Sequence, residues 1–232
     1  MNNSKKKIDT TKMVGIAIFS SLAFVVALVC NVIPPVAGFL SLDVKDAIIT
    51  IASFIYGPMS AVLISLIAAL IELLTFSTTG WYGFVMNFAS SVAFSLTASL
   101  IYKKLRSLNG ALISVFSAVV LTTCIMLLLN VFVTPLYLVY IGTPKEAASP
   151  TVIGMLAKVL LPFNFAKALM NSAVVMLLYK PISRAMRSTH LAASKSMNGQ
   201  DRSEHFNKNT VIILSVGAAT LAVAIAIILI IS

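Results

Sequence analysis

The sequence consists largely of apolar runs that are long enough to cross a lipid bilayer. A helix that spans the hydrocarbon core needs about 20 apolar residues, and several runs in this chain reach that length. Only 10% of the 232 residues are charged, whereas soluble domains carry about 25% charged residues. The chain is therefore expected to be an all-α integral membrane protein with one bundle of spanning helices.

Hydropathy and turn signals divide the chain into four parts. These are a basic cytoplasmic N-terminus (1–12), a six-helix membrane core (13–187), a flexible cytoplasmic linker (188–210) and an additional transmembrane helix (211–232). The expected spans are 13–32, 47–56, 58–74, 82–102, 111–138, 163–179 and 211–231. The stretch 149–160 is predicted to form a short outer or re-entrant helix. Pro162 is predicted to open the sixth span, because the first residue of a helix needs no N–H.

Most of the 17 basic residues fall on one side of the predicted bundle. The residues on that side are Lys5, Lys6, Lys7, Lys12, Lys103, Lys104, Arg106, Lys180, Arg184, Arg187, Lys195, Arg202 and Lys208. Cytoplasmic loops are enriched in Lys and Arg, so the N-terminus and the linker are expected in the cytoplasm. The net charge of +10 therefore indicates orientation in a bilayer, and no nucleic-acid partner is expected.

Costly polar side chains occur at the same depth in four predicted spans. Glu72 lies in the third span, Asn87 in the fourth and Asn130 in the fifth, and Asn164 and Lys167 lie in the sixth. A charged residue near a helix centre costs about 2.5–3.5 kcal/mol on insertion. Such residues therefore pair with one another, line a cavity or bind a ligand, and we expect them to meet in one pocket open to the outside.

A structural role for the same residues is the alternative. Interhelical hydrogen bonds in membranes contribute about 0.6 kcal/mol each, and Glu72 would then pair with Lys167. Asn164, Lys167 and Asn171 are spaced at i, i+3 and i+7, so they share one helical face. Under either interpretation this face points into the bundle.

Two outer loops are expected beside the pocket. The first, 39–49, carries three charged residues just before an apolar helix. The second, 74–88, combines Thr79 and other hydroxyl residues with two glycines and an aromatic cluster around Trp81. Trp81 alone also fits a membrane-interface residue. Small-molecule sites combine apolar walls with a few placed polar groups, so the two loops favour a flat heteroaromatic ligand over an ion.

Motifs typical of catalysis are missing from the sequence. There is no GxxxxGK[ST] phosphate loop, so the chain is not expected to hydrolyse ATP, and HExxH and GxSxG motifs are also missing. Cys30 and Cys124 fall within predicted spans and lack the spacing of metal ligands, so no metal or other cofactor is expected. The chain is interpreted as a binding component and not as an enzyme.

Four short motifs follow one another along the chain: LSLDVKDAI at 40–48, ELLTFSTTG at 72–80, VMNF at 85–88 and PFNFAK at 162–167. As a set they resemble the riboflavin-binding substrate components of energy-coupling factor (ECF) transporters, over about residues 10–187. The resemblance implies a six-helix fold in a bacterial plasma membrane and capture of riboflavin from outside, with the first outer loop as a gate. The seventh span departs from that pattern.

The resemblance also implies roles for particular residues. Asn164 and Lys167 match positions that contact the flavin, and Asn130 matches an amide of the fifth span. Residues 39–46 and Trp81 would cover the ring. The complete set of expected binding residues is Asn164, Lys167, Asn130, Asn87, Glu72, Thr79, Trp81, Asp43, Lys45 and Asp46.

Small residues in the first span predict a close helix contact. Ala17, Ser20 and Ser21 lie within GIAIFSSLA at 15–23, and small residues let membrane helices approach closely. The resemblance implies that this surface meets a transmembrane coupling subunit, which is joined to two ATPase subunits that use ATP. Packing within this chain is the alternative.

Three other functions remain open from the sequence. The same machinery would carry another vitamin if a few pocket residues differed. A stand-alone proton-coupled permease would depend on Glu72 and would need no ATPase. A membrane scaffold would use its polar residues only to hold helices together and would show no saturable ligand.

Overall fold

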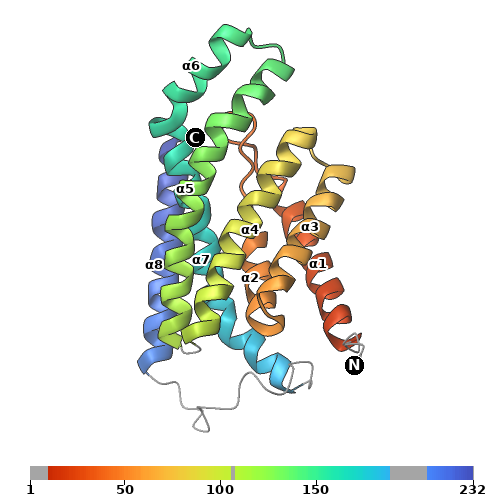
Figure 1. The fold of residues 1–232 in the computed structure, drawn as a ribbon. Coiled ribbons are helices and arrows are strands. Elements are labelled where there is room, and N and C mark those ends of the chain that lie inside the picture. Colours follow the sequence, from red (N-terminus) through yellow and green to blue (C-terminus); the bar gives the residue numbers. More distant parts are fainter. Residues whose placement is uncertain (1–9, 106–107, 189–207, 232) are drawn as a thin grey trace, which may run out of the picture.

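The computed structural model describes residues 10–105, 108–188 and 208–231, which form a bundle of helices (Figure 1). The helices are α1 (Thr10–Cys30), α2 (Lys45–Tyr56), α3 (Pro58–Thr75), α4 (Gly80–Leu105), α5 (Leu108–Tyr140), α6 (Lys145–Met155), the π-helical η1 (Leu156–Leu160), α7 (Leu161–Ser188) and α8 (Lys208–Ile231). All seven predicted spans are helical. Six helices in the described part of the chain, with α6 to α7 counted as one, are long and apolar enough to cross a membrane.

Helix α2 is the one predicted span that is too short to cross a membrane, and it is a core helix instead. With 12 residues it is about 18 Å long, which is too short for about 30 Å of hydrocarbon. Ten of its residues are buried, and it packs against α1, α3, α4 and α7. Lys45 and Asp46, which the sequence placed in an outer loop, are its first two residues and lie inside the bundle.

The N-terminus of α2 therefore needs hydrogen-bond partners from the protein, since no water is available at membrane depth. Asn171 of α7 provides them. Its Oδ1 accepts from the Ala47 N–H at 2.8 Å, and its Nδ2 donates to the Asp43 carbonyl at 3.1 Å. The other end of α2 closes at Gly57, whose φ of 94° favours glycine. Pro58 then begins α3.

Hydroxyl groups join α2 to α4. Ser91, Ser95 and Ser99 are spaced four residues apart, so they lie on one face of α4. Ser91 donates to the Asp46 carboxylate, and Ser95 donates to the Asp46 carbonyl at 3.2 Å. Ser99 donates to the Ser53 carbonyl at 3.2 Å. These bonds fix the depth of α2, and with it the position of the charged groups at its start.

Helices α6 and α7 are continuous through η1. Figure 1 shows α6 projecting beyond most of the bundle at the end away from the N-terminus, so it does not fold back into the bundle as a re-entrant helix would. Helix α7 begins at Leu161, and Pro162 is its second residue, not its first as predicted. The Leu161 N–H bonds to the Leu156 carbonyl five residues back. This π turn carries the helix through the proline, which has no N–H to donate, so η1 and α7 form one continuous helix.

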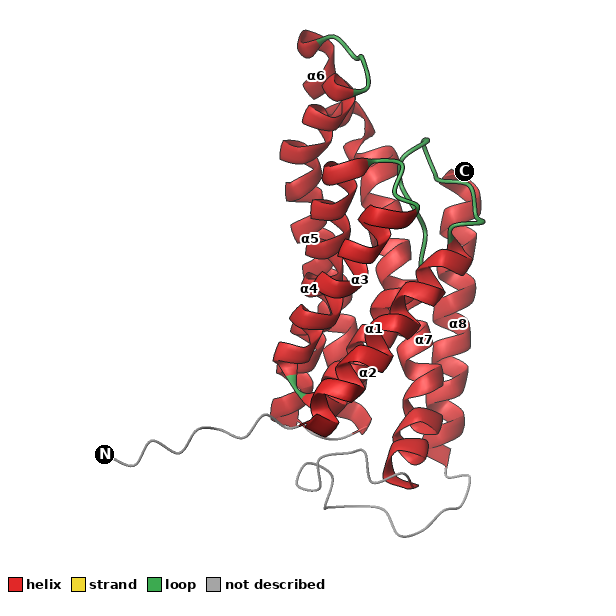
Figure 2. Cartoon of the chain, turned by 90° about the vertical axis from the view of Figure 1, so that its right-hand side faces the viewer, coloured by secondary structure: helices red, strands yellow, loops and turns green. Residues whose placement is uncertain are grey.

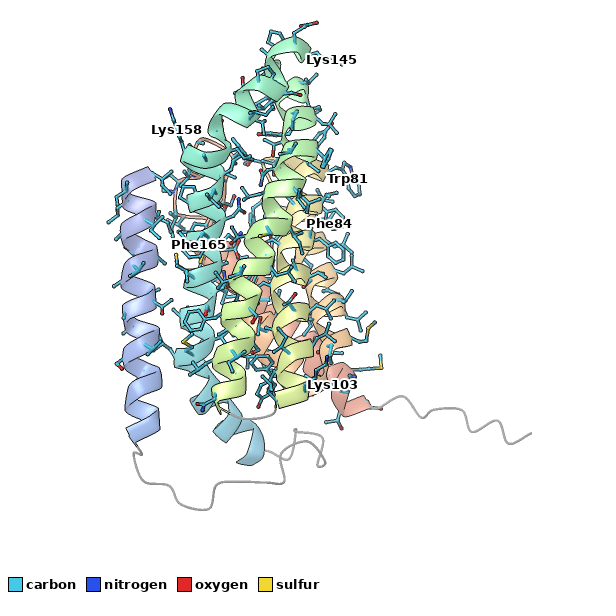
Figure 3. All side chains as sticks on the ribbon, turned by 60° about the vertical axis from the view of Figure 1, so that its left-hand side comes forward. Trp81, Phe84, Lys103, Lys145, Lys158 and Phe165 are labelled. Atoms are coloured by element: carbon cyan, nitrogen blue, oxygen red, sulfur yellow. The ribbon has the colours of Figure 1, made fainter. Side chains whose placement is uncertain are left out.

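Helix α8 packs along α7 at the edge of the bundle (Figure 3). The predicted linker, 188–210, lies almost entirely outside the described residues. Figure 3 places Lys103 at the end of the bundle where α1 begins, and Lys145 and Lys158 at the other end. This separation of the basic residues agrees with the one predicted from the sequence.

Candidate functional site

A pocket lies between α4, α5, α7 and the loop 31–44 that connects α1 to α2. Its empty volume, which includes space open to solvent, is about 640 Å³. Apart from two tyrosines, the polar residues that line it are Ser41, Thr79, Asn87, Ser90, Asn130, Thr134, Asn164 and Lys167. Three of the four predicted helices thus bring amides and one ammonium group to a single cavity, whereas Glu72 of α3 does not line it.

The amide side chains of Asn130 and Asn164 are held by hydrogen bonds along their own helices. Asn130 donates from Nδ2 to the Met126 carbonyl at 2.7 Å and accepts at Oδ1 from the Thr134 hydroxyl at 2.8 Å. Asn164 donates from Nδ2 to the Leu160 carbonyl at 2.7 Å. Because these bonds run along each residue's own helix, they orient the amides without drawing them out of the pocket.

Lys167 is held at the edge of the pocket by the loop 31–44. Its Nζ lies 2.7 Å from Asp43 Oδ2 and donates to the Ser41 carbonyl at 3.2 Å. Lys167 is 8% exposed and Asp43 is 5% exposed, so the pair is almost fully withdrawn from solvent. A buried charge needs such a partner, because an isolated one carries a large desolvation cost.

A second ion pair lies next to the first. Both carboxylate oxygens of Glu72 are 2.7 Å from Lys45 Nζ, and Lys45 Nζ is 3.8 Å from Asp43 Oδ2. Asn87 donates to Glu72 at 3.1 Å. The series Glu72, Lys45, Asp43, Lys167 therefore joins α3, α2, the loop and α7, and we call it the charge network.

The charges of the network determine the ionisation of Asp43. Burial by itself raises the pKa of this carboxyl group. The positive charges of Lys167 and Lys45 outweigh burial and hold the pKa of Asp43 below its ordinary value. Asp43 is therefore an anion that can retain both lysines.

Several predicted binding residues lie outside the pocket wall. Thr79 lines the pocket as predicted, whereas Asp43, Lys45 and Glu72 lie behind it in the charge network. Asp46 accepts from Ser91 of α4. Glu72 pairs with Lys45 and not with Lys167, the partner considered from the sequence.

Trp81 also lies away from the pocket. Its side chain is 68% exposed, and its ring packs edge-on against Phe84 with centroids 5.7 Å apart. Figure 3 shows both rings pointing outward from the bundle. The membrane-interface alternative therefore fits Trp81 better than a role over the ligand.

Other aromatic residues occupy the place expected for Trp81. Phe39, Tyr82, Tyr137 and Phe163 line the pocket. The ring of Tyr137 lies 5.8 Å from that of Phe39 and 6.0 Å from that of Tyr82, measured between centroids. Sequence reasoning noticed Tyr82 only as a neighbour of Trp81. Tyr137 lies one turn beyond Thr134 and two turns beyond Asn130 on the inward side of α5, and this spacing was the available signal for it.

The lining has the chemistry of a site for an organic ligand. Aromatic rings provide flat apolar walls, while the amides, hydroxyls and Lys167 supply donors and acceptors. Among the residues that the structure describes, no group of three His, Cys, Asp or Glu side chains is placed to hold a metal ion.

The small residues of α1 divide between two faces. Ala17 and Ser21 are exposed, whereas Ser20 is 2% exposed and donates to the Ile16 carbonyl at 2.8 Å. Ser20 therefore packs within this chain and cannot belong to an outer docking surface. Ala17 and Ser21 remain available on the outer face of α1.

Comparison with known proteins agrees with this architecture. The family model of the ECF transporter substrate-specific component matches residues 11–179. The chain belongs to this family. Every pocket residue named above lies within the matched range, so the pocket is part of the substrate-specific component (S component) core. The S component is a multi-pass membrane protein, and α8 lies beyond the matched range.

Individual relatives resemble this S component over most of its length. Riboflavin transporter RibU of Staphylococcus aureus (strain TCH60) is 29% identical over 189 residues, which cover 80% of this chain and 98% of that protein. Riboflavin transporter FmnP of Bacillus subtilis (strain 168) is 28% identical over 186 residues, covering 78% and 97%. A solved structure of the S component of a bacterial ECF transporter matches with a TM-score of 0.64 at 27% identity, covering 78% of this chain and 99% of that one.

Proposed function

We propose that this S component binds riboflavin at the outer side of the membrane and delivers it to an ECF-type uptake transporter. The observation that carries the proposal is the convergence of Asn130, Asn164 and Lys167 in one pocket walled by aromatic rings. Relatives named riboflavin transporters, similar over most of their own length, support the same ligand for this chain.

The pocket chemistry suits a flavin. The isoalloxazine ring is flat, and one edge carries carbonyl oxygens and ring nitrogens that accept hydrogen bonds. Lys167 and Asn164 would donate to that edge, and Asn130 and Asn87 would bond other ring atoms or the ribityl hydroxyls. Tyr137 and its aromatic neighbours would cover the ring faces, where stacking suits a flat π system.

Transport requires further subunits under this proposal. A transmembrane coupling subunit and two ATPase subunits would use ATP to drive release on the inner side, while this chain binds substrate and catalyses no reaction. The basic end of the bundle, with Lys103, would face the cytoplasm of a bacterium, so the N-terminus would be cytoplasmic and the pocket would open outward.

An absorption spectrum tests the ligand directly. Protein purified in detergent from cells grown with riboflavin is expected to show flavin bands in near-stoichiometric amount, and the stripped protein to quench the fluorescence of added riboflavin. A colourless protein that leaves riboflavin fluorescence unchanged would contradict the flavin assignment. Saturable binding of a different vitamin would then assign the pocket to that ligand.

Bulky substitutions on α1 test the docking surface. Ala17→Trp and Ser21→Trp are expected to reduce riboflavin uptake at least about tenfold, because an interface built on small residues cannot admit an indole without separating the helices. Riboflavin binding by the purified S component should not change, since both side chains lie outside the pocket.

A lipid-facing position elsewhere provides the control for the docking experiment. Leu128→Trp, at a residue that is 62% exposed on α5, should leave uptake intact. Normal uptake by the α1 variants, with the coupling subunit still co-purifying, would remove Ala17 and Ser21 from the interface.

A further inference from the structure

Helix α8 lies outside the family match, yet it packs closely against the family core. At Gly217 an added side-chain carbon would lie 3.4 Å from the Leu177 side chain of α7, so the helices are in contact there. Val216, Ala224 and Ile227 follow the same inward face and pack with the main core. Ala224 follows Gly217 by seven residues and Val216 by eight, and Ile227 follows Ala224 by three, so these residues share one helical face.

The C-terminal end of α8 packs against a different cluster. Ile228 and Ile231 pack against a group of buried apolar residues that we call the outer cluster. Its members are Val36, Leu40, Leu42, Leu138, Ala148, Val152, Leu160 and Phe163. The outer cluster thus combines residues of the loop 31–44 with residues of α5, α6, η1 and α7.

The outer cluster forms the back of the pocket wall. Leu40 and Phe163 belong to the cluster and also line the pocket, and Phe39 lines the pocket while packing against the cluster. Any group that holds this cluster together therefore also holds one side of the pocket. Figures 2 and 3 show the loop between α1 and α2 lying beside the C-terminal end of α8.

The loop has few other apolar anchors. Residues 31–35 are exposed, and the turn that follows is closed by two backbone bonds of 3.0 Å between Val36 and Leu40. Beyond the turn, Asp43 fixes the loop to Lys167. Between these points Lys167 donates to the Ser41 carbonyl and Phe39 packs on Tyr137. The remaining apolar contacts are those of the outer cluster, in which Val36, Leu40 and Leu42 are buried.

We propose that Ile228 and Ile231 are positioning residues, which hold the 36–42 turn against the pocket and thereby slow the release of riboflavin. The proposal rests on the proposed riboflavin function. It gives α8 a part in ligand retention beyond that of a membrane anchor, because its last turn packs against the cluster that forms the pocket wall.

The last turn of α8 supplies its own matched control. Ile228 and Ile231 face the outer cluster, whereas Leu229 and Ile230, of the same size, are 73% and 84% exposed. The double variant Ile228→Ala/Ile231→Ala removes the inward contacts. The double variant Leu229→Ala/Ile230→Ala removes the same amount of apolar side chain from the outer face.

Dissociation of radiolabelled riboflavin, chased with excess unlabelled riboflavin, is the first measurement. We expect release from the inward variant to be about three- to tenfold faster, where tenfold corresponds to about 1.4 kcal/mol. The outward variant should release at the wild-type rate. The variant Ile228→Val/Ile231→Val should restore most of the retention. Equal rates for the inward and outward variants would overturn the proposal.

Hydrogen exchange provides a second measurement that needs no ligand. The Val36 and Leu40 amides, which bond across the turn, should exchange faster in the inward variant than in the outward one. A lower melting temperature of the inward variant without faster exchange or faster release would assign these residues to stability alone. If the wild-type protein binds no riboflavin, the proposed function fails, and the exchange result then decides separately whether α8 positions the turn.

Discussion

The variant Lys45→Met is expected to lose about 3–5 kcal/mol of folding stability, because removing one partner of a buried ion pair leaves an uncompensated charge. Lys45 is 1% exposed and lies 2.7 Å from both carboxylate oxygens of Glu72. Without it, the Glu72 carboxylate keeps, among the residues that the structure describes, only the hydrogen bond from Asn87. Methionine fills a similar volume, so the loss reports the charge and not a cavity. Thermal unfolding in detergent measures it.

Two further variants separate the ion pair from a general effect of losing a lysine. Lys145→Met, at an exposed position, should unfold at the wild-type temperature. Lys45→Met/Glu72→Gln should recover part of the lost stability, since the unpaired carboxylate is then gone. If Lys45→Met unfolds at the same temperature as Lys145→Met, the charge network does not stabilise the fold.

Loss of riboflavin binding is the second large effect that we expect. Lys167→Ala and Asn164→Ala should each weaken binding at least about tenfold, or about 1.4 kcal/mol, because each removes a polar group from the pocket wall. The combined variant should lose the flavin bands of the purified protein. Titration of riboflavin by fluorescence quenching measures the affinities.

Asp43 makes Lys167→Ala harder to interpret, because it loses the partner 2.7 Å away. Asp43 would then keep only the longer contact of 3.8 Å with Lys45 among its described ion pairs, and the variant Asp43→Asn/Lys167→Ala removes this poorly paired charge. If the doubly substituted protein binds riboflavin as the wild type does, Lys167 supports the loop and does not contact the ligand. Lys158→Ala, at an exposed position on η1, is the control and should bind normally.

The helices and the polar side of the pocket were predictable from sequence. Apolar runs give the spans because membrane insertion depends on local hydropathy. Asn87, Asn130, Asn164 and Lys167 stand out because they are costly in hydrocarbon, and helix spacing places them at one depth. Inside a membrane such side chains are stable only where they face the interior of the bundle and can line a cavity or pair with other polar groups.

The partners of those groups could not be read from the sequence. Glu72 pairs with Lys45 because the loop 31–44 descends into the bundle, and that path depends on the packing of α2 among four other helices. Trp81 and Tyr82 are adjacent in sequence, yet only Tyr82 lines the pocket. Which neighbour faces inward depends on the rotation of α4, which contacts with other helices determine.

The burial of α2 has a consequence for the order of assembly during synthesis. A helix of 12 residues that begins with a lysine and an aspartate cannot partition into lipid by itself. Its partners Ser91 and Asn171 are made later, and Asn171 follows Ala47 by 124 positions. The Ala47 N–H must therefore wait for its Asn171 partner until most of the chain has left the ribosome, although Lys45 can meet Asp43 and Glu72 earlier. A chain that stops before α7 would present this polar end to the machinery that removes unfinished membrane proteins.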